Sequence, residues 1–156
     1  DIVIECAPAA HFAAIADPTV EAGRTLVALS AGALLSRPDL IEAADISGAQ
    51  IIVPTGALIG LDAVRAMAQG EIESVRLVTR KPPKGLIGAP HLETDGVDVS
   101  ALTEPLRVFQ GNAFDAAKAF PANINVGAAL ALAGTGGRPG FRVIASDSPK
   151  VSPPST

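Results

Sequence analysis

The sequence predicts an α/β protein in which a parallel sheet is followed by an α+β region with a mixed sheet. Two observations lead to this prediction. Up to Gly60, short continuous apolar runs alternate with segments of helical periodicity, as expected for parallel strands that are buried on both faces. After Gly60, the strand-like segments alternate polar and apolar residues, which is typical of a sheet with one face in water.

The first predicted strand is Ile2–Cys6, an apolar run that stops just before a proline. The next segment, 9–23, carries apolar residues at helical spacing, and Gly23 stands where a helix would end. Pro18 lies inside this segment and predicts either a kink or the start of a second turn.

Two further strand-and-helix units follow. Strands are predicted at 25–29 and 49–53, separated by a turn at 30–33 and a short helix at 38–44. Strands joined through helices in this way build a parallel sheet by right-handed crossovers. Three such strands account for half of a dinucleotide-binding sheet, so we expect the C-terminal half of a Rossmann-type sheet.

The segment Ile51–Ala63 is the first candidate for a ligand site. Its β-branched run stops at Pro54, passes through a Thr-Gly-Ala turn and opens a helix near Leu61. In open α/β sheets, ligands bind outside the carboxyl ends of the strands, where such turns lie. Because the turn is small and almost uncharged, it suits close approach of a backbone to a flat ligand.

The second half is expected to contain strands, short helices and turns rich in proline and glycine. In order, they are a helix at 61–69 capped by Gly70, a strand at 74–79, a loop at 80–90, a strand at 106–110, a helix at 113–119, a turn at 120–123, a helix at 124–133 and a strand at 142–145. We therefore expect a partial dinucleotide-binding domain at 1–56, a partial catalytic α+β domain at 57–146 and a Pro/Ser-rich tail at 147–156.

The segment Phe120–Gly134 is the second candidate for a ligand site. Asn123 and Asn125 stand at the start of its helix, and two asparagines two residues apart cannot both cap one helix. One of them is therefore free to meet a ligand amide. The helix that follows has small residues along one face, which suit either core packing or contact with a flat ligand. If both segments serve one site, 51–63 and 120–126 must converge in space.

Only a few of the titratable side chains are candidates for a role in binding or catalysis. Glu5 lies in an apolar strand, so we expect it either to face a ligand site or to pair with a cation. His11 and His91 have no carboxylate or cysteine arranged around them in sequence, which favours surface or structural roles. Arg80 and Lys81 end a predicted strand and are either an exposed strand end or a site for a carboxylate or phosphate.

Composition excludes several classes of function. The net charge of -4 and the five aromatic residues among 156 argue against nucleic-acid partners, which need basic patches or stacking platforms. Cys6 is the only cysteine, so an internal disulfide and a Cys-cluster metal site are excluded, and we expect its side chain to be buried. We expect no membrane span, no signal peptide, no metal and a cytoplasmic location.

Several segments, in the same order along the chain, resemble the aspartate dehydrogenase family of amino-acid dehydrogenases. They are Ile4-Glu5-Cys6-Ala7, Leu29-Ser30-Ala31-Gly32-Ala33-Leu34, Pro54-Thr55-Gly56-Ala57, Leu61-Asp62-Ala63, Thr79-Arg80-Lys81-Pro82, Phe120-Pro121-Ala122-Asn123-Ile124-Asn125-Val126 and Ala131-Leu132-Ala133-Gly134. One of these segments would be weak evidence, but together they are specific.

The resemblance implies an NAD- or NADP-dependent enzyme that interconverts L-aspartate and iminoaspartate, with oxaloacetate and ammonia released on hydrolysis and a link to NAD biosynthesis. It implies a homodimer with a Rossmann-type domain and a mixed α/β catalytic domain. It also implies that Ala57 and Asn125 contact the cofactor, and that Ser30 and Gly32 lie near its nicotinamide side.

Two departures from the family pattern limit the transfer of function. The family's glycine-rich phosphate loop has no counterpart, and 149–156 contains neither residue of the family's Asn-x-His motif, so we assign no catalytic residue. We expect a chain that is incomplete at both ends and inactive alone. An inactive relative acting as a binding or interaction module is one alternative. An oxidoreductase of the homoserine or dihydrodipicolinate type is another, and residues 80–88 would distinguish it.

Overall fold

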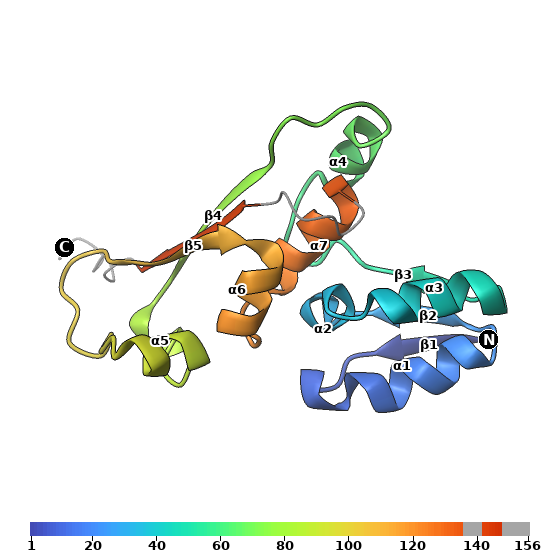
Figure 1. Cartoon of the computed structure of the whole chain (residues 1–156), viewed down its shortest axis with the longest axis horizontal. Coiled ribbons are helices and arrows are strands. Elements are labelled where there is room, and N and C mark those ends of the chain that lie inside the picture. The colour runs from blue at the N-terminus through green and yellow to red at the C-terminus, as the bar shows by residue number, and fades with distance from the viewer. Residues whose placement is uncertain (136–141, 148–156) are drawn as a thin grey trace, which may run out of the picture.

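The first sheet consists of three parallel strands in the order β1 (Ile2–Glu5), β2 (Thr25–Ala28) and β3 (Gln50–Ile52), as the computed structural model shows (Figure 1). The structure describes residues 1–135 and 142–147, so the tail predicted at 147–156 lies outside the described residues except for Asp147. Helices α1 (Phe12–Glu21) and α3 (Pro38–Ser47) pack together over this sheet. The strand-and-helix alternation predicted from the sequence is confirmed.

One face of the first sheet is covered and the other is open. The core beneath α1 and α3 contains Phe12, Val20 and Leu26, which are almost completely buried. The strands are in register, with Glu5 opposite Ala28, so Glu5 points to the covered face. On the opposite face, Ile4 is 63% exposed, so the expectation that these strands are buried on both faces is wrong for the described residues.

Cys6 is exposed, which contradicts the expectation of a buried thiol. Glu5 is the last residue of β1 and is buried, whereas Cys6 lies beyond the strand, where the chain leaves the sheet. The strand therefore ends one residue earlier than predicted.

The predicted turn at 30–33 contains the beginning of a short helix, α2 (Ala31–Leu35). Five residues are too few to show helical periodicity, so the sequence pattern misses this helix. Tertiary contacts stabilise it, because Leu34 and Leu35 are buried in two different core clusters. The segment 9–23 is divided into a 3₁₀ turn, η1 (Ala9–His11), and α1, which contains Pro18.

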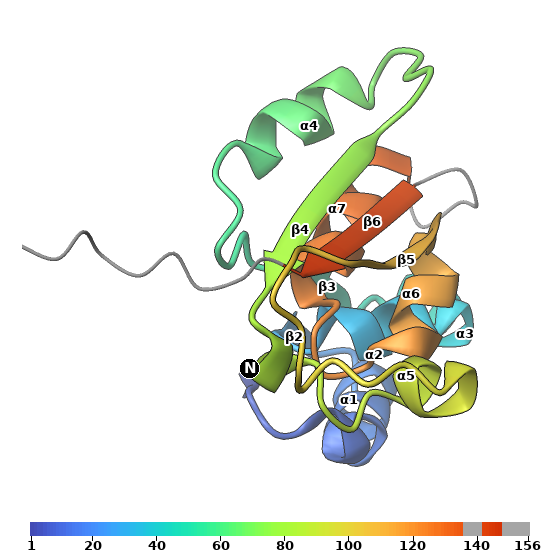
Figure 2. The ribbon, with the colours of Figure 1, turned by 90° about the vertical axis from the view of Figure 1, so that its left-hand side faces the viewer.

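The second sheet is mixed, as the alternating strands predict. Its order is β4 (Arg76–Lys81), β6 (Arg142–Asp147) and β5 (Arg107–Asn112), with β4 parallel and β5 antiparallel to β6. Figure 2 shows helices α6 (Ala113–Ala119) and α7 (Asn125–Thr135) behind this sheet, with α4 (Leu61–Met67) beside β4. The predicted bounds of α6 are confirmed in full.

The predicted loop at 80–90 is wrong in part. Strand β4 continues to Lys81, a 3₁₀ turn η2 (Pro83–Gly85) follows, and helix α5 (Pro90–Asp95) begins at the end of the segment. Proline is tolerated in the first turn of a helix, and Gly96 ends α5 in the left-handed conformation. Because Leu92 is the one buried residue of α5, the sequence shows no apolar period there.

Helix α7 joins the two halves of the molecule. It packs against α2 of the first half and against α4 and α6 of the second. Its small residues permit this, since Ala128 and Ala131 are completely buried in the core shared by these helices. Core packing therefore accounts for most of the small face of this helix. Among the described residues, no helix is long and apolar enough to cross a membrane.

Candidate functional site

The two segments singled out from the sequence meet at one hollow of about 270 Å³. It lies beyond the carboxyl ends of β2 and β3 and the start of α7, and its lining residues are Leu29, Ala31, Val53, Pro54, Thr55, Gly56, Ala57, Asn125, Val126 and Ala129. The predicted convergence of 51–63 with 120–126 is confirmed. We refer to these residues as the β3–α7 hollow.

One wall of the β3–α7 hollow is the turn that follows β3. The N–H of Leu58 donates to the carbonyl of Thr55 at 3.1 Å and closes this turn. Gly56 has φ of 56°, a left-handed conformation that residues with a Cβ atom rarely adopt. Ala57 is exposed at the turn. The wall is therefore made of backbone and small side chains, which allows close approach to a flat group.

Asn125 forms the facing wall at the first residue of α7. Its Oδ1 accepts a hydrogen bond from the N–H of Gly32 at 3.1 Å. Since Oδ1 is engaged, the amide presents Nδ2, which has no acceptor among the described residues. Asn123 is engaged elsewhere, because its Nδ2 donates to the carbonyl of Gly85 at 3.0 Å. Of the two asparagines, Asn125 is the one with a free donor at the hollow.

Gly32 lies behind the β3–α7 hollow at the crossing of α2 and α7. A Cβ atom on Gly32 would lie 2.5 Å from Cγ2 of Ile124, so only glycine fits this crossing without displacement. The close approach brings the Gly32 N–H to Asn125. Gly32 is buried and does not line the hollow itself.

Ser30 is also buried behind the wall, where it binds Glu5. The N–H of Ser30 donates to Glu5 Oε2 at 2.9 Å, and its hydroxyl lies 3.1 Å from Oε1. The N–H of Ala7 donates to the same Oε1 at 3.0 Å. Both expectations for Glu5 are wrong: it does not line the hollow, and among the described residues its partners are backbone amides and a hydroxyl, not a cation.

The other candidate residues do not join this site. His11 is exposed in η1. His91 is a packing residue, with Nε2 3.1 Å from the carbonyl of Val108 and its ring edge-on to Phe109 and Phe120. The expectation that no carboxylate stands near it is wrong, because Oδ2 of Asp95 lies 3.6 Å from the same nitrogen. These positions agree with the surface and structural roles favoured from the sequence.

The charged end of β4 is likewise outside the β3–α7 hollow. Arg80 is exposed, and Lys81 lines a small cavity of about 20 Å³ that Phe109 and Phe120 also line. No group of His, Cys, Asp and Glu suited to hold a metal ion occurs within the described part of the chain. None of the residues that line the β3–α7 hollow carries a charge, so the lining offers apolar contacts and neutral hydrogen-bonding groups but no ion pair.

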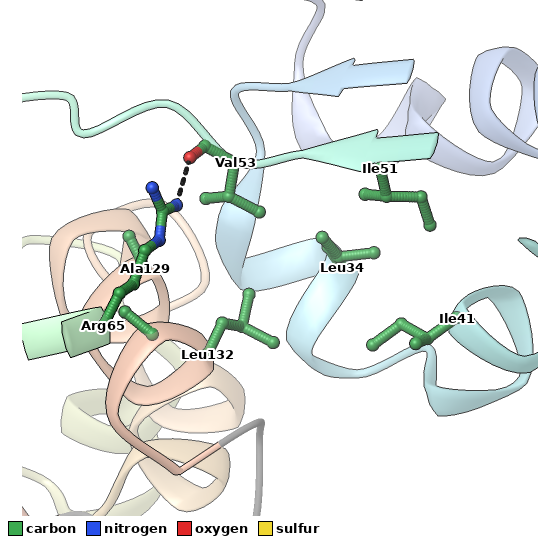
Figure 3. A pocket seen from close by; sticks show the side chains of 8 residues that line it. Leu34, Ile41, Ile51, Val53, Arg65, Ala129 and Leu132 are labelled. Carbon is green, nitrogen blue, oxygen red and sulfur yellow. Dashed lines mark hydrogen bonds between the residues drawn. The ribbon is translucent and has the colours of Figure 1, made fainter. Parts of the chain in front are cut away.

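A second hollow, separate from the β3–α7 hollow, has a volume of about 220 Å³ and was not found from the sequence. Figure 3 shows Leu34, Ile41, Ile51 and Leu132 around it, and Arg65 donating to the carbonyl of Val53 at 2.9 Å. Its residues come from five elements, so no local pattern could reveal it. Val53 and Ala129 line both hollows.

The family model described as aspartate dehydrogenase, C-terminal, matches residues 62–151. L-aspartate dehydrogenase 3 of Bordetella bronchiseptica is 55% identical over 136 residues, covering 87% of this chain and 50% of that protein. The L-aspartate dehydrogenase of Bradyrhizobium diazoefficiens is 54% identical over 136 residues, covering 87% of this chain and 49% of that protein. The chain spans about half the length of these curated relatives.

The crystal structure of aspartate dehydrogenase from Thermotoga maritima has a similar fold. It superposes with a TM-score of 0.73 at 26% sequence identity and covers 96% of this chain and 58% of that one.

Proposed function

Because the chain belongs to the aspartate dehydrogenase family, we propose that it forms the nicotinamide side of an NAD- or NADP-dependent L-aspartate dehydrogenase. This enzyme oxidises L-aspartate to iminoaspartate, which water converts to oxaloacetate and ammonia. The observation that carries the proposal is the β3–α7 hollow, where an uncharged turn after β3 faces the free amide donor of Asn125.

The residues of the β3–α7 hollow fit a nicotinamide group. A nicotinamide is a flat ring with one carboxamide, and the hollow offers a backbone wall at Ala57 and the Nδ2 donor of Asn125. A bound nicotinamide would supply the acceptor for the hydride that leaves the substrate carbon. The protein's part is to orient the ring, and we assign this to Ala57 and Asn125 directly and to Ser30 and Gly32 from behind the wall.

The organisation of the chain follows from the same proposal. Residues 1–56 would belong to a Rossmann-type dinucleotide-binding domain and 57–146 to the catalytic domain. We further propose a homodimer that works in the cytoplasm and whose iminoaspartate feeds NAD biosynthesis. These assignments rest on the family and on the placement of the β3–α7 hollow at the carboxyl ends of β2 and β3.

The proposal is tested on the protein expressed from its complete reading frame. We expect L-aspartate to drive reduction of NAD⁺ or NADP⁺, followed by the absorbance of the reduced nicotinamide, while D-aspartate and L-glutamate give little reduction. A protein that reduces neither cofactor with L-aspartate would contradict the proposed activity.

Cofactor binding is measured separately from turnover. Titration with NADH or NADPH, followed by the fluorescence of the reduced nicotinamide, should show saturable binding. Nicotinamide mononucleotide should compete, because the proposed hollow binds the nicotinamide half of the cofactor. Competition by adenosine monophosphate alone would place the binding elsewhere.

A further inference from the structure

Glu5 is a completely buried carboxylate that the proposed reaction does not use. Its two oxygens accept hydrogen bonds from the N–H groups of Ala7 and Ser30, and the Ser30 hydroxyl lies within reach of Oε1. Burying a carboxylate is unfavourable unless such donors compensate for the lost water. An apolar residue at this position would leave the N–H groups of Ala7 and Ser30 without an acceptor, so Glu5 holds the backbone at both residues as well as filling space.

The partner of Glu5 is the residue that joins β2 to α2. Ser30 lies between Leu29 and Ala31, and both of these neighbours line the β3–α7 hollow. Its carbonyl accepts the N–H groups of Ala33 and Leu34 in the first turn of α2. A fixed position of Ser30 therefore also sets the positions of Leu29 and Ala31 and the residue at which α2 begins.

The hydrogen bond between Glu5 and Ser30 is connected through α2 to Asn125 on the facing wall of the hollow. Gly32 is two residues beyond Ser30, and its N–H donates to Oδ1 of Asn125 at 3.1 Å. The direction of this N–H depends on where α2 begins. Because Oδ1 is held there, Nδ2 is the end of the amide that is presented to the hollow.

We propose that Glu5 is a positioning residue for the nicotinamide wall, acting through Ser30 and α2 on the side-chain amide of Asn125. This inference rests on the proposed function only for the nature of the ligand. The hydrogen bonds from Glu5 to Ser30 and from Gly32 to Asn125 define the chain of contacts independently of it.

The substitution Glu5→Gln distinguishes positioning from simple filling of space. Glutamine has the same shape, but both Glu5 oxygens accept backbone N–H groups. An amide NH₂ must therefore face one of these donors, in either orientation. We expect the Ser30 turn to shift and the cofactor to bind about tenfold more weakly, the effect of one misplaced hydrogen bond. Ser30→Ala removes only the hydroxyl contact and should weaken binding less.

The control variant is Val20→Ala, which creates a cavity in the core beneath α1, away from the hollow. It should lower thermal stability while leaving cofactor affinity and the KM for the cofactor unchanged. All variants are made in the protein from its complete reading frame, with isotope-labelled asparagine. The expected signature of positioning is a shifted side-chain amide resonance of Asn125 in Glu5→Gln and not in Val20→Ala.

Several results would overturn the inference. Normal cofactor affinity and an unmoved Asn125 resonance in Glu5→Gln would do so, as would equal weakening by Val20→Ala. If Glu5→Gln does not fold, Ser30→Ala must show the resonance shift for the inference to stand. Failure of the proposed function has a different signature, because the unsubstituted protein would then bind no reduced cofactor, while the Asn125 resonance would still report the positioning.

Discussion

Oδ1 of Asn125 accepts a hydrogen bond from the backbone N–H of Gly32 at 3.1 Å, across 93 residues of sequence. This contact ties the helix after β2 to the helix that follows the Phe120–Asn123 turn. It also orients the amide, so that the group presented to the β3–α7 hollow is a donor. The bond therefore links the packing of the two halves to the polarity of the candidate site.

Two substitutions at Asn125 separate these roles. Asn125→Asp keeps an acceptor for Gly32 and removes the donor, so we expect cofactor affinity to fall about tenfold or more with little change in unfolding free energy. Asn125→Ala also leaves the buried Gly32 N–H unpaired, which costs about 1–3 kcal/mol. Fluorescence titration and urea unfolding measure the two quantities. Equal cofactor affinity in the unsubstituted protein and Asn125→Asp would show that Nδ2 does not contact the ligand.

Gly32→Ala should destabilise the crossing of α2 and α7. The added Cβ would lie 2.5 Å from Cγ2 of Ile124, and overpacking of this kind costs about 1–3 kcal/mol. Gly70→Ala is the matched control, because a Cβ there meets its nearest atom at 3.6 Å, an ordinary contact. Urea unfolding of both variants tests the difference. A Gly32→Ala protein as stable as Gly70→Ala would mean that Ile124 moves aside freely.

Ala57→Leu should block the β3–α7 hollow without harming the fold. Ala57 is exposed on the turn that lines the hollow, so a larger side chain occupies ligand space and displaces no core residue. We expect a thermal midpoint close to that of the unsubstituted protein and a KM for the cofactor raised about tenfold or more. Ala63→Leu, exposed on α4 outside the hollow, is the control and should leave the KM unchanged.

Two aspartates should contribute to the loss of folding stability at acidic pH. Hydrogen bonding from Arg37 lowers the pKa of Asp39, and the hydroxyl and amide of Ser100 lower the pKa of Asp98. A lowered pKa in the folded state means that the charged form stabilises the protein above the unfolded pKa of about 4. This stabilisation is lost as the pH falls through the lower folded value.

Thermal unfolding of Asp39→Asn between neutral and acidic pH measures this effect. We expect its midpoint to fall below that of the unsubstituted protein at neutral pH and to approach it in acid. The difference should be small, because Asp39 is exposed and its ion pair with Arg37 is screened. Glu42→Gln, on the same helix and without a partner among the described residues, should show no such convergence.

Local patterns determined much of the fold. Apolar runs and helical spacing predict the strands of the first sheet, and the bounds of α6 at Ala113–Ala119 are confirmed in full. They fail at α2 and α5, because helices of five or six residues show no period and depend on tertiary packing. They also fail at Cys6, because strand β1 ends one residue before it, at Glu5.

The sequence by itself determined which segments build the candidate site. Small uncharged turns at strand ends have a local chemical signal, and the resemblance to a dehydrogenase family led to the prediction that 51–63 and 120–126 converge, which is confirmed. The tertiary structure alone decided how the individual residues serve it. Ser30 and Gly32 stand behind the wall, and Glu5 holds Ser30, through hydrogen bonds that span 25 and 93 residues. Bonds of such separation leave no periodic or local trace in a sequence, because they form only when segments far apart along the chain pack together.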